Sequence, residues 1–225
     1  MDQLKKIIGR NIVWLLIAVL VVGFFVIANQ SDSEVVKNPD FIAAADDTDM
    51  FMGDKNAPVD LVVYTDFLCP YCAQFANDTM PEIEKEFVDT GKVKVETRPI
   101  AMIGVDSGLA AEGAYCAADQ DSFKSYHDTL YAYAQSEIFD KNISTRETSV
   151  ITKATLGDLM ESADTLDQKA FSDCLEDDTY AAEVEKATAN ATAEGVSGTP
   201  YVMVNGNHVQ GLSYDILSAV IKAQL

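Results

Sequence analysis

The chain has 225 residues, of which 48% are hydrophobic and 23% charged. This length is enough for one sizeable domain with appendages. Its 36 acidic residues against 16 basic ones give a formal net charge of −20. A surface this negative repels phosphate backbones, so the composition argues against nucleic-acid binding.

The N-terminal residues differ sharply from the rest of the chain. Lys5, Lys6 and Arg10 precede an apolar stretch over residues 12–28, which is at the short end for a transmembrane helix. A cleaved signal peptide is the alternative, although residues 27–31 match a small-x-small cleavage site poorly. In both cases the basic residues stay inside and the remainder is exported. We expect residues 1–28 to be a cytoplasmic stub and a single-pass anchor in the cell membrane, with the main domain on the extracytoplasmic side.

The next segments predict a tether followed by a β-α-β unit. Residues 29–50 are polar and acidic, as expected of a flexible linker. Residues 59–67 (VDLVVYTDF) predict a buried strand, and residues 92–100 predict a second strand. Between them, from Pro70 to about residue 88, apolar residues follow a helical spacing that Pro81 should kink or split. A strand, a helix and a second strand in this order imply a parallel pair with a right-handed crossover.

The second half of the chain predicts helices first and a hairpin last. Residues 106–195 contain several segments with apolar residues at helical spacing and almost no strand signal. The pair Asn205-Gly206 then separates two short apolar runs, which is a strong hairpin signal. A final helix begins at about Ser213. The predicted order is β-α-β, a helical insert, and α-β-β-α.

Four cysteines lie in the exported part: Cys69, Cys72, Cys116 and Cys174. An even number outside the cytoplasm favours disulfides. A zinc site made of four thiolates usually needs two close pairs, and this chain has one close pair and two distant single cysteines. We therefore expect no metal and no other cofactor.

Cys69-Pro70-Tyr71-Cys72 lies where a predicted strand meets a predicted helix. At a helix N-terminus the unpaired N–H groups and the helix dipole favour a negative sulfur, and Pro70 fits the first turn without losing a hydrogen bond. Cys72, one turn later, is within disulfide range and would resolve a mixed disulfide formed at Cys69. The alternatives are a structural disulfide and half of a metal site.

The segment Gly198-Thr199-Pro200 opens the predicted hairpin. A cis Thr199–Pro200 bond beside the cysteines would expose backbone groups to an extended substrate. The position alone does not distinguish cis from trans, since most X-Pro bonds are trans.

Together these motifs resemble the DsbA-like family of thioredoxin-fold proteins. The resemblance rests on residues 66–72 (DFLCPYC), on Cys116 with the residues that follow it, and on residues 195–200 (GVSGTP). It covers about residues 51–225 and implies an α/β thioredoxin-like fold with an α-helical subdomain inserted at about 104–178. It also implies Cys69 as the attacking thiol, Cys72 as the resolving thiol and a cis Pro200 that faces them.

Two residues depart from the family pattern. Relatives commonly have a carboxylate six residues before the first cysteine, and this chain has Val63. That carboxylate serves as a proton relay to the cysteine pair. Asp66 is one candidate to replace it, but by alternation it lies on the opposite face of the strand, and the alternative that we favour is a turn or a cap. The strongest oxidants of the family have histidine within the motif where this chain has Tyr71. We therefore expect an oxidant of moderate potential.

Cys116 and Cys174 lie on two different predicted helices of the insert. The family often pairs these positions, and such a bridge would stabilise the fold by about 4 kcal/mol in the chain-entropy model. The alternative is two buried free thiols. His127 is expected at the core or at the subdomain boundary, and His208 is expected to be exposed. The aromatic residues of the insert either line a peptide groove or form its core, namely Tyr126, Tyr131, Tyr133 and Phe139.

The expected function is that of a monomeric protein that donates its Cys69–Cys72 disulfide to reduced exported polypeptides. The family resemblance implies reoxidation by a quinone-linked membrane partner. An isomerase or a reductase would use the same two cysteines in another direction, and a redox-inactive peptide-binding chaperone would use neither.

Overall fold

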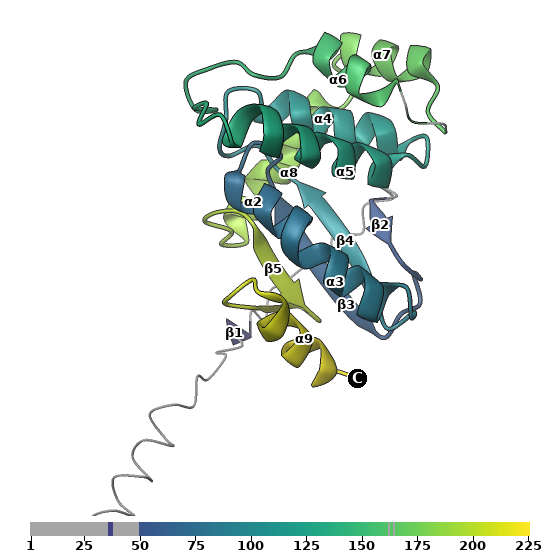
Figure 1. Cartoon of the computed structure of the whole chain (residues 1–225), viewed down its shortest axis with the longest axis vertical. Helices are drawn as coiled ribbons and strands as arrows, with labels where there is room; N and C mark the ends of the chain where they lie inside the picture. The colour runs from purple at the N-terminus through teal and green to yellow at the C-terminus, as the bar shows by residue number, and fades with distance from the viewer. Residues whose placement is uncertain (1–35, 38–49, 162, 164) are drawn as a thin grey trace, which may run out of the picture. The chain divides into compact units, whose positions relative to one another are not determined.

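The computed structural model describes residues 36–37, 50–161, 163 and 165–225 (Figure 1). The predicted anchor over residues 1–28 lies outside these residues, as does the predicted linker apart from 36–37 and 50. No helix in the described part of the chain is long and apolar enough to cross a membrane.

A six-stranded mixed sheet with the order β1-β6-β5-β3-β4-β2 is the frame of the described residues. Its strands are β1 Val36–Lys37, β2 Phe51–Met52, β3 Val59–Thr65, β4 Val93–Pro99, β5 Tyr201–Val204 and β6 Asn207–His208. β3 and β4 are parallel, and the other neighbouring pairs are antiparallel. β1 pairs with β6, which the prediction of a flexible linker over residues 29–50 did not include.

The helical segment after β3 is divided as its proline predicts. It consists of α2 Pro70–Gln74, η1 Phe75–Thr79, α3 Met80–Ile83 and η2 Glu84–Val88, where η1 and η2 are π-helical turns. Pro81 lies in the first turn of α3 and has no N–H to donate to the preceding turn. The hydrogen-bond register therefore shifts beside it, and the segment continues as a new α-helical turn.

The helical insert follows β4 and contains α4 Ser107–Ala118, α5 Phe123–Tyr133, η3 Ala134–Phe139, α6 Lys153–Met160 and α7 Gln168–Glu176. Two of its helices begin at side-chain caps: Thr152 accepts a hydrogen bond at the start of α6, and Asp167 does so at the start of α7. The chain then returns to the sheet through α8 Ala181–Ala193 and, after the β5–β6 hairpin, ends in α9 Tyr214–Lys222.

The β5–β6 hairpin has the turn that its sequence predicts. Asn205 and Gly206 both have positive φ, at 47° and 75°, and a two-residue turn with positive φ at both positions matches the twist of the flanking strands.

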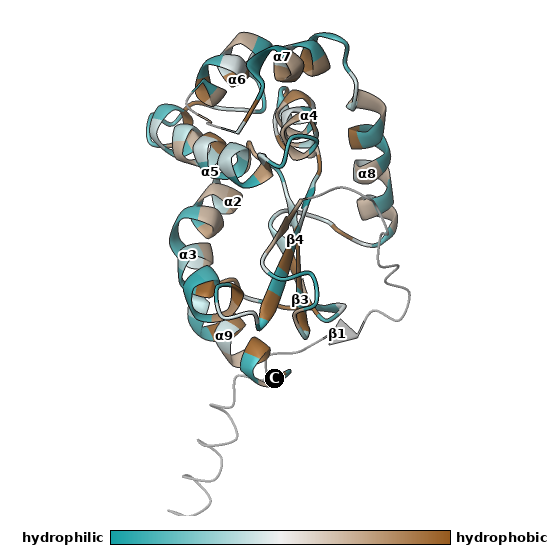
Figure 2. Cartoon of the chain, turned by 90° about the vertical axis from the view of Figure 1, so that its right-hand side faces the viewer, coloured by the Kyte–Doolittle hydropathy of each residue, from teal (hydrophilic) through white to brown (hydrophobic). Residues whose placement is uncertain are grey.

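Helices cover both faces of the sheet. Figure 2 shows α3 and α9 on one side of the strands and α8 on the other, with α4 to α7 gathered at one end. One apolar core packs β3, β4 and β5 against the helical segment 75–88 and α9, and a smaller core lies toward α8. A third core joins the insert helices to Cys69 and Cys72. The two cysteines therefore lie at the junction between the sheet domain and the helical insert.

Candidate active site

Cys69 lies where β3 ends and α2 begins. It is the N-cap residue of α2, with an extended backbone at φ −95° and ψ 120°, and Pro70 occupies the first turn. Cys69 and Cys72 are free thiols with only 3% and 1% of their surface exposed. Tyr71, between them, is 69% exposed. The motif therefore presents one aromatic side chain to solvent beside two nearly buried sulfurs.

The surroundings of the Cys69 sulfur favour its ionised form. The hydrogen bond from the Cys72 thiol is the largest influence, burial acts in the opposite direction, and further hydrogen bonds come from the Thr199 side chain and from backbone N–H groups of α2. Together they lower the pKa of Cys69 to about 6. Because the thiolate is the nucleophile in disulfide exchange, Cys69 is mostly in its reactive form at neutral pH.

Cys72 has the opposite character. Burial raises its pKa well above the usual value, and the hydrogen bond to Cys69 and the charge of Cys69 raise it further. The Thr65 side chain and the backbone of Asp66 act against this rise through hydrogen bonds to the sulfur. The pair therefore has one sulfur that ionises readily and one that is held as a thiol.

The Thr199–Pro200 segment faces Cys69 from the start of β5. The Thr199–Pro200 peptide bond is cis, and the Cys69 thiol donates to the Thr199 carbonyl oxygen at 3.3 Å. The Thr199 hydroxyl is buried and has no hydrogen-bond partner among the described residues, so it is available to donate to the Cys69 thiolate, and this lowers the pKa of Cys69. Residues 130 positions apart in the sequence thus meet at one sulfur.

Asp66 organises the loops around the motif. It is fully buried, and its carboxylate accepts hydrogen bonds at 2.7–2.9 Å from the N–H groups of Leu68, Met102 and Ile103 and from the Ser107 hydroxyl. These donors belong to the loop before Cys69, the loop after β4 and the start of α4. The turn-forming role that the sequence favoured for Asp66 is therefore the one that the structure gives it.

Cys116 and Cys174 form a disulfide that joins α4 to α7. Their Cα atoms are 6.0 Å apart and the two residues are separated by 58 positions, a distance typical of disulfides. The bridge lies within the helical insert, apart from the Cys69–Cys72 pair in the sequence.

The two histidines differ in their surroundings. His127 is buried on α5, with its Nδ1 2.9 Å from Asp128 Oδ1, as expected of a core residue. His208 is partly buried because it stacks on Tyr201, with ring centroids 3.9 Å apart. The expectation that His208 is exposed is therefore wrong, since a ring on the neighbouring strand covers it.

Thr65 and Tyr131 are site residues that the sequence did not single out as a pair. Their hydroxyl groups hydrogen-bond each other beside Cys72. Tyr131 and Tyr126 are each 1% exposed, so they belong to the core of the insert and not to an open groove. A polar residue at the end of an apolar strand, four positions before Cys69, is the only sequence signal for Thr65.

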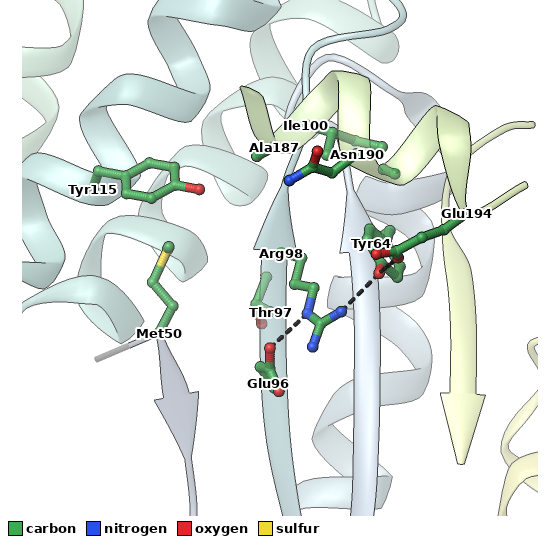
Figure 3. A pocket seen from close by; sticks show the side chains of 11 residues that line it. Met50, Tyr64, Glu96, Thr97, Arg98, Ile100, Tyr115, Ala187, Asn190 and Glu194 are labelled. Atoms are coloured by element: carbon green, nitrogen blue, oxygen red, sulfur yellow. Dashed lines mark hydrogen bonds and ion pairs between the residues drawn. The ribbon is translucent and has the colours of Figure 1, made fainter. Parts of the chain in front are cut away.

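A groove and a cavity near the sheet differ in their relation to the cysteine motif. A groove of about 280 Å³ lies beside the exposed Tyr71 and is lined by Gln74, Phe75, Asp78, Thr79, Leu212 and Ser213. Figure 3 shows the other, a cavity of about 60 Å³ where α8 covers β3 and β4. Its Arg98 donates to Glu96 at 2.5 Å and to the Tyr64 hydroxyl at 2.7 Å, and Tyr64 donates to Glu194 at 2.5 Å. The groove is therefore next to the cysteine motif, whereas the cavity holds a network of paired charges.

Among the residues that the structure describes, no group of three or more His, Cys, Asp or Glu side chains is arranged to hold a metal ion.

Comparison with known proteins agrees with this geometry. The thioredoxin family model matches residues 45–223. The chain is 30% identical over 177 residues to disulfide bond formation protein D of Bacillus subtilis, covering 77% of this chain and 76% of that protein. It is also 30% identical over 227 residues to a probable disulfide bond formation protein D of Bacillus anthracis, covering 100% and 99% of the two chains. The crystal structure of oxidised BdbD from Bacillus subtilis has a TM-score of 0.68 and 27% identity, covering 78% of this chain and 92% of that one.

Proposed function

From the premise that the chain belongs to the thioredoxin family and is a DsbA-like thiol–disulfide oxidoreductase, we propose that Cys69 and Cys72 are its redox-active pair. The observation that carries this proposal is the Cys69 sulfur at the start of α2, where hydrogen bonds lower its pKa to about 6. Pro70, Tyr71, Thr199 and Pro200 complete the site around that sulfur.

Disulfide donation follows from the different character of the two sulfurs. A substrate thiolate attacks the Cys69 sulfur of the oxidised pair, the Cys69–Cys72 bond breaks, and Cys72 leaves with the electron pair. The second substrate thiol then attacks the mixed disulfide at the substrate sulfur, and Cys69 leaves as a thiolate. The substrate is oxidised by two electrons and the enzyme is reduced by two. Because a thiol of low pKa is the better leaving group, the lowered pKa of Cys69 favours donation over reduction.

Substrate recognition is assigned to the surface on either side of Cys69. Tyr71 is exposed, and the groove beside it has a mixed lining of aromatic, aliphatic and polar side chains. On the other side the Thr199 backbone contacts the Cys69 sulfur. A substrate chain that crosses this point would bring its own sulfur to Cys69, and reduced exported polypeptides are the substrates that fit such an open site.

The membrane assignment belongs to this proposal as well. The basic residues and the apolar stretch of residues 1–28 support a single-pass anchor with the catalytic domain on the extracytoplasmic side. An anchored domain would be held near a quinone-linked membrane partner that restores the Cys69–Cys72 disulfide. Protease treatment of intact protoplasts should digest the domain and leave a small membrane-bound fragment, whereas recovery of the domain in the medium would support a cleaved signal peptide.

Oxidation of a reduced two-cysteine peptide by the oxidised protein tests the catalytic assignment. Wild type should form the peptide disulfide, and Cys69→Ala should lose this activity while it stays folded. The double variant Cys116→Ala, Cys174→Ala is the control that loses a different disulfide, and at a temperature where it is folded it should keep the activity. Full activity of Cys69→Ala would contradict the assignment and favour a binding protein.

Redox equilibration with glutathione tests the direction of exchange. We expect a reduction potential clearly above the value of about −270 mV that is typical of thioredoxin. A value as low as that of thioredoxin would overturn the oxidase assignment in favour of a reductase.

A further inference from the structure

A small cavity lies directly behind Cys72. It has a volume of about 10 Å³, which is room for about one water molecule. Apart from Cys72, its polar lining consists of Thr65, Thr97, His127 and Tyr131, and all four are buried, with at most 6% of their surface exposed. Any group that stabilises a charge on the inner sulfur must therefore come from the protein and not from bulk water.

Two of these groups form a hydrogen-bonded chain that ends on the Cys72 sulfur. The hydroxyl groups of Thr65 and Tyr131 bond each other, Thr65 and Cys72 line the same cavity, and hydrogen bonding by the Thr65 side chain acts to lower the pKa of Cys72 against the effect of burial. Burial raises the pKa of Tyr131 well above its usual value, so the phenol keeps its proton throughout the working range. The Tyr131 hydroxyl also lies 3.5 Å from the Asp66 carbonyl oxygen, a longer contact than the one with Thr65. When Tyr131 donates to its closer partner, the Thr65 oxygen, the single hydroxyl proton of Thr65 is free to face the sulfur.

Disulfide exchange places a charge on the inner sulfur that such a donor would stabilise. Cys72 carries a negative charge when it leaves Cys69, and again when it attacks Cys69 to restore the disulfide. A buried anion without a partner is strongly disfavoured. Val63, on the same strand as Thr65, also lines the cavity but offers no polar group.

We propose that Thr65 is a catalytic residue that donates a hydrogen bond to the Cys72 thiolate, and that Tyr131 is a positioning residue that orients the Thr65 hydroxyl. The inference rests on the roles proposed above for Cys69 and Cys72. The Thr65 proton stays on its oxygen and the electron pair stays on sulfur. A charge-assisted hydrogen bond is stronger than a neutral one, so the bond strengthens as the charge develops and lowers the barrier to the step.

The ionisable groups that face Cys72 come from three parts of the described chain. Cys69 is at the start of α2, Asp66 contributes its backbone from the preceding loop, and His127 and Tyr131 lie on α5. On β4, Thr97 lines the cavity with a group that does not ionise. These neighbours are the same in wild type and in variants at position 65. A difference between the pH profiles of wild type and a variant therefore reports on the Thr65 hydroxyl.

Stopped-flow reaction of the reduced full-length protein with Ellman's reagent separates the two sulfurs. Cys69 attacks first and releases one thionitrobenzoate in a bimolecular phase. Cys72 then attacks the Cys69 mixed disulfide and releases the second thionitrobenzoate in a unimolecular phase. In Thr65→Val we expect the second phase to slow by about tenfold at neutral pH, the effect of one lost hydrogen bond to a charged group, with its pH midpoint about one unit higher. The first phase should change less than twofold.

Three variants identify the origin of the effect. Thr65→Ser keeps a hydroxyl and should restore the rate of the second phase. Tyr131→Phe should slow the second phase less than Thr65→Val does. Thr97→Val removes another hydroxyl from the same cavity and should leave the rate of the second phase unchanged. An unchanged second phase in Thr65→Val, or equal slowing of both phases, would overturn the inference. Absence of the first phase in wild type would instead contradict the proposed function.

Discussion

The ionisation of Cys69 should make the stability of the reduced protein depend on pH in a defined way. The pKa of Cys69 is about 6 in the folded protein against an ordinary value of 9.0. The folded state therefore binds this proton less tightly than the unfolded chain does. The resulting stabilisation is present at high pH and is lost as the pH falls through about 6.

The size of the effect follows from the two pKa values. Because a shift of one unit corresponds to about 1.4 kcal/mol, the thiolate stabilises the folded state by about 1.4 kcal/mol at pH 7 and by less than about 0.1 kcal/mol at pH 5. Urea unfolding of reduced wild type and reduced Cys69→Ser, over about pH 5 to 7, measures this difference. Any reduction of the Cys116–Cys174 bridge is common to both proteins and cancels.

The difference in free energy of unfolding between the two proteins should therefore increase by about 1.4 kcal/mol across this range. A difference that stays constant to within about 0.3 kcal/mol would show that Cys69 does not ionise near pH 6 in the folded protein, and the reasoning from its surroundings would be refuted.

Three further outcomes are expected. Replacing Cys116 and Cys174 with alanine removes a cross-link between residues 58 positions apart and should lower the free energy of unfolding by about 4 kcal/mol in urea titrations; a loss below about 1 kcal/mol would contradict this. Gly113→Ala places a methyl group against a buried tyrosine of α5, so it should lower the melting temperature and reduce the free energy of unfolding by about 1–3 kcal/mol. Gly108→Ala on the same helix meets open space and should be neutral or stabilising. Equal melting temperatures of the two variants would argue against this packing. Thr199→Val removes a buried hydroxyl that is available to donate to the attacking thiolate, and it should raise the pKa of Cys69 in an ultraviolet thiolate titration; an unchanged midpoint would exclude this role of the hydroxyl.

Local sequence patterns identified the parts of the fold that local physics determines. The β-branched run of β3, the turn at Asn205-Gly206 and the interruption at Pro81 each depend on neighbouring residues, and all three are found where the sequence predicts them. The position of Cys69 at the start of α2 follows from the same kind of pattern.

Contacts between distant segments were beyond the reach of such patterns. The hydrogen bond between Thr65 and Tyr131 joins the end of β3 to α5, 66 positions away, and no spacing rule links these two residues. The stacking of His208 on Tyr201 depends on the register of β5 and β6, and so the burial of His208 was not predicted. The short strand β1 is likewise defined by its pairing with β6 rather than by its own sequence.

Titration of the reduced full-length protein by the ultraviolet absorbance of its thiolates tests the central claim most directly. The account predicts a transition with a midpoint at about pH 6 in wild type. The transition should be absent in Cys69→Ser. In Cys72→Ala it should still occur, with its midpoint shifted upward because the hydrogen bond from Cys72 is lost. A wild-type midpoint near the ordinary thiol value, or a low midpoint that persists in Cys69→Ser, would contradict the account.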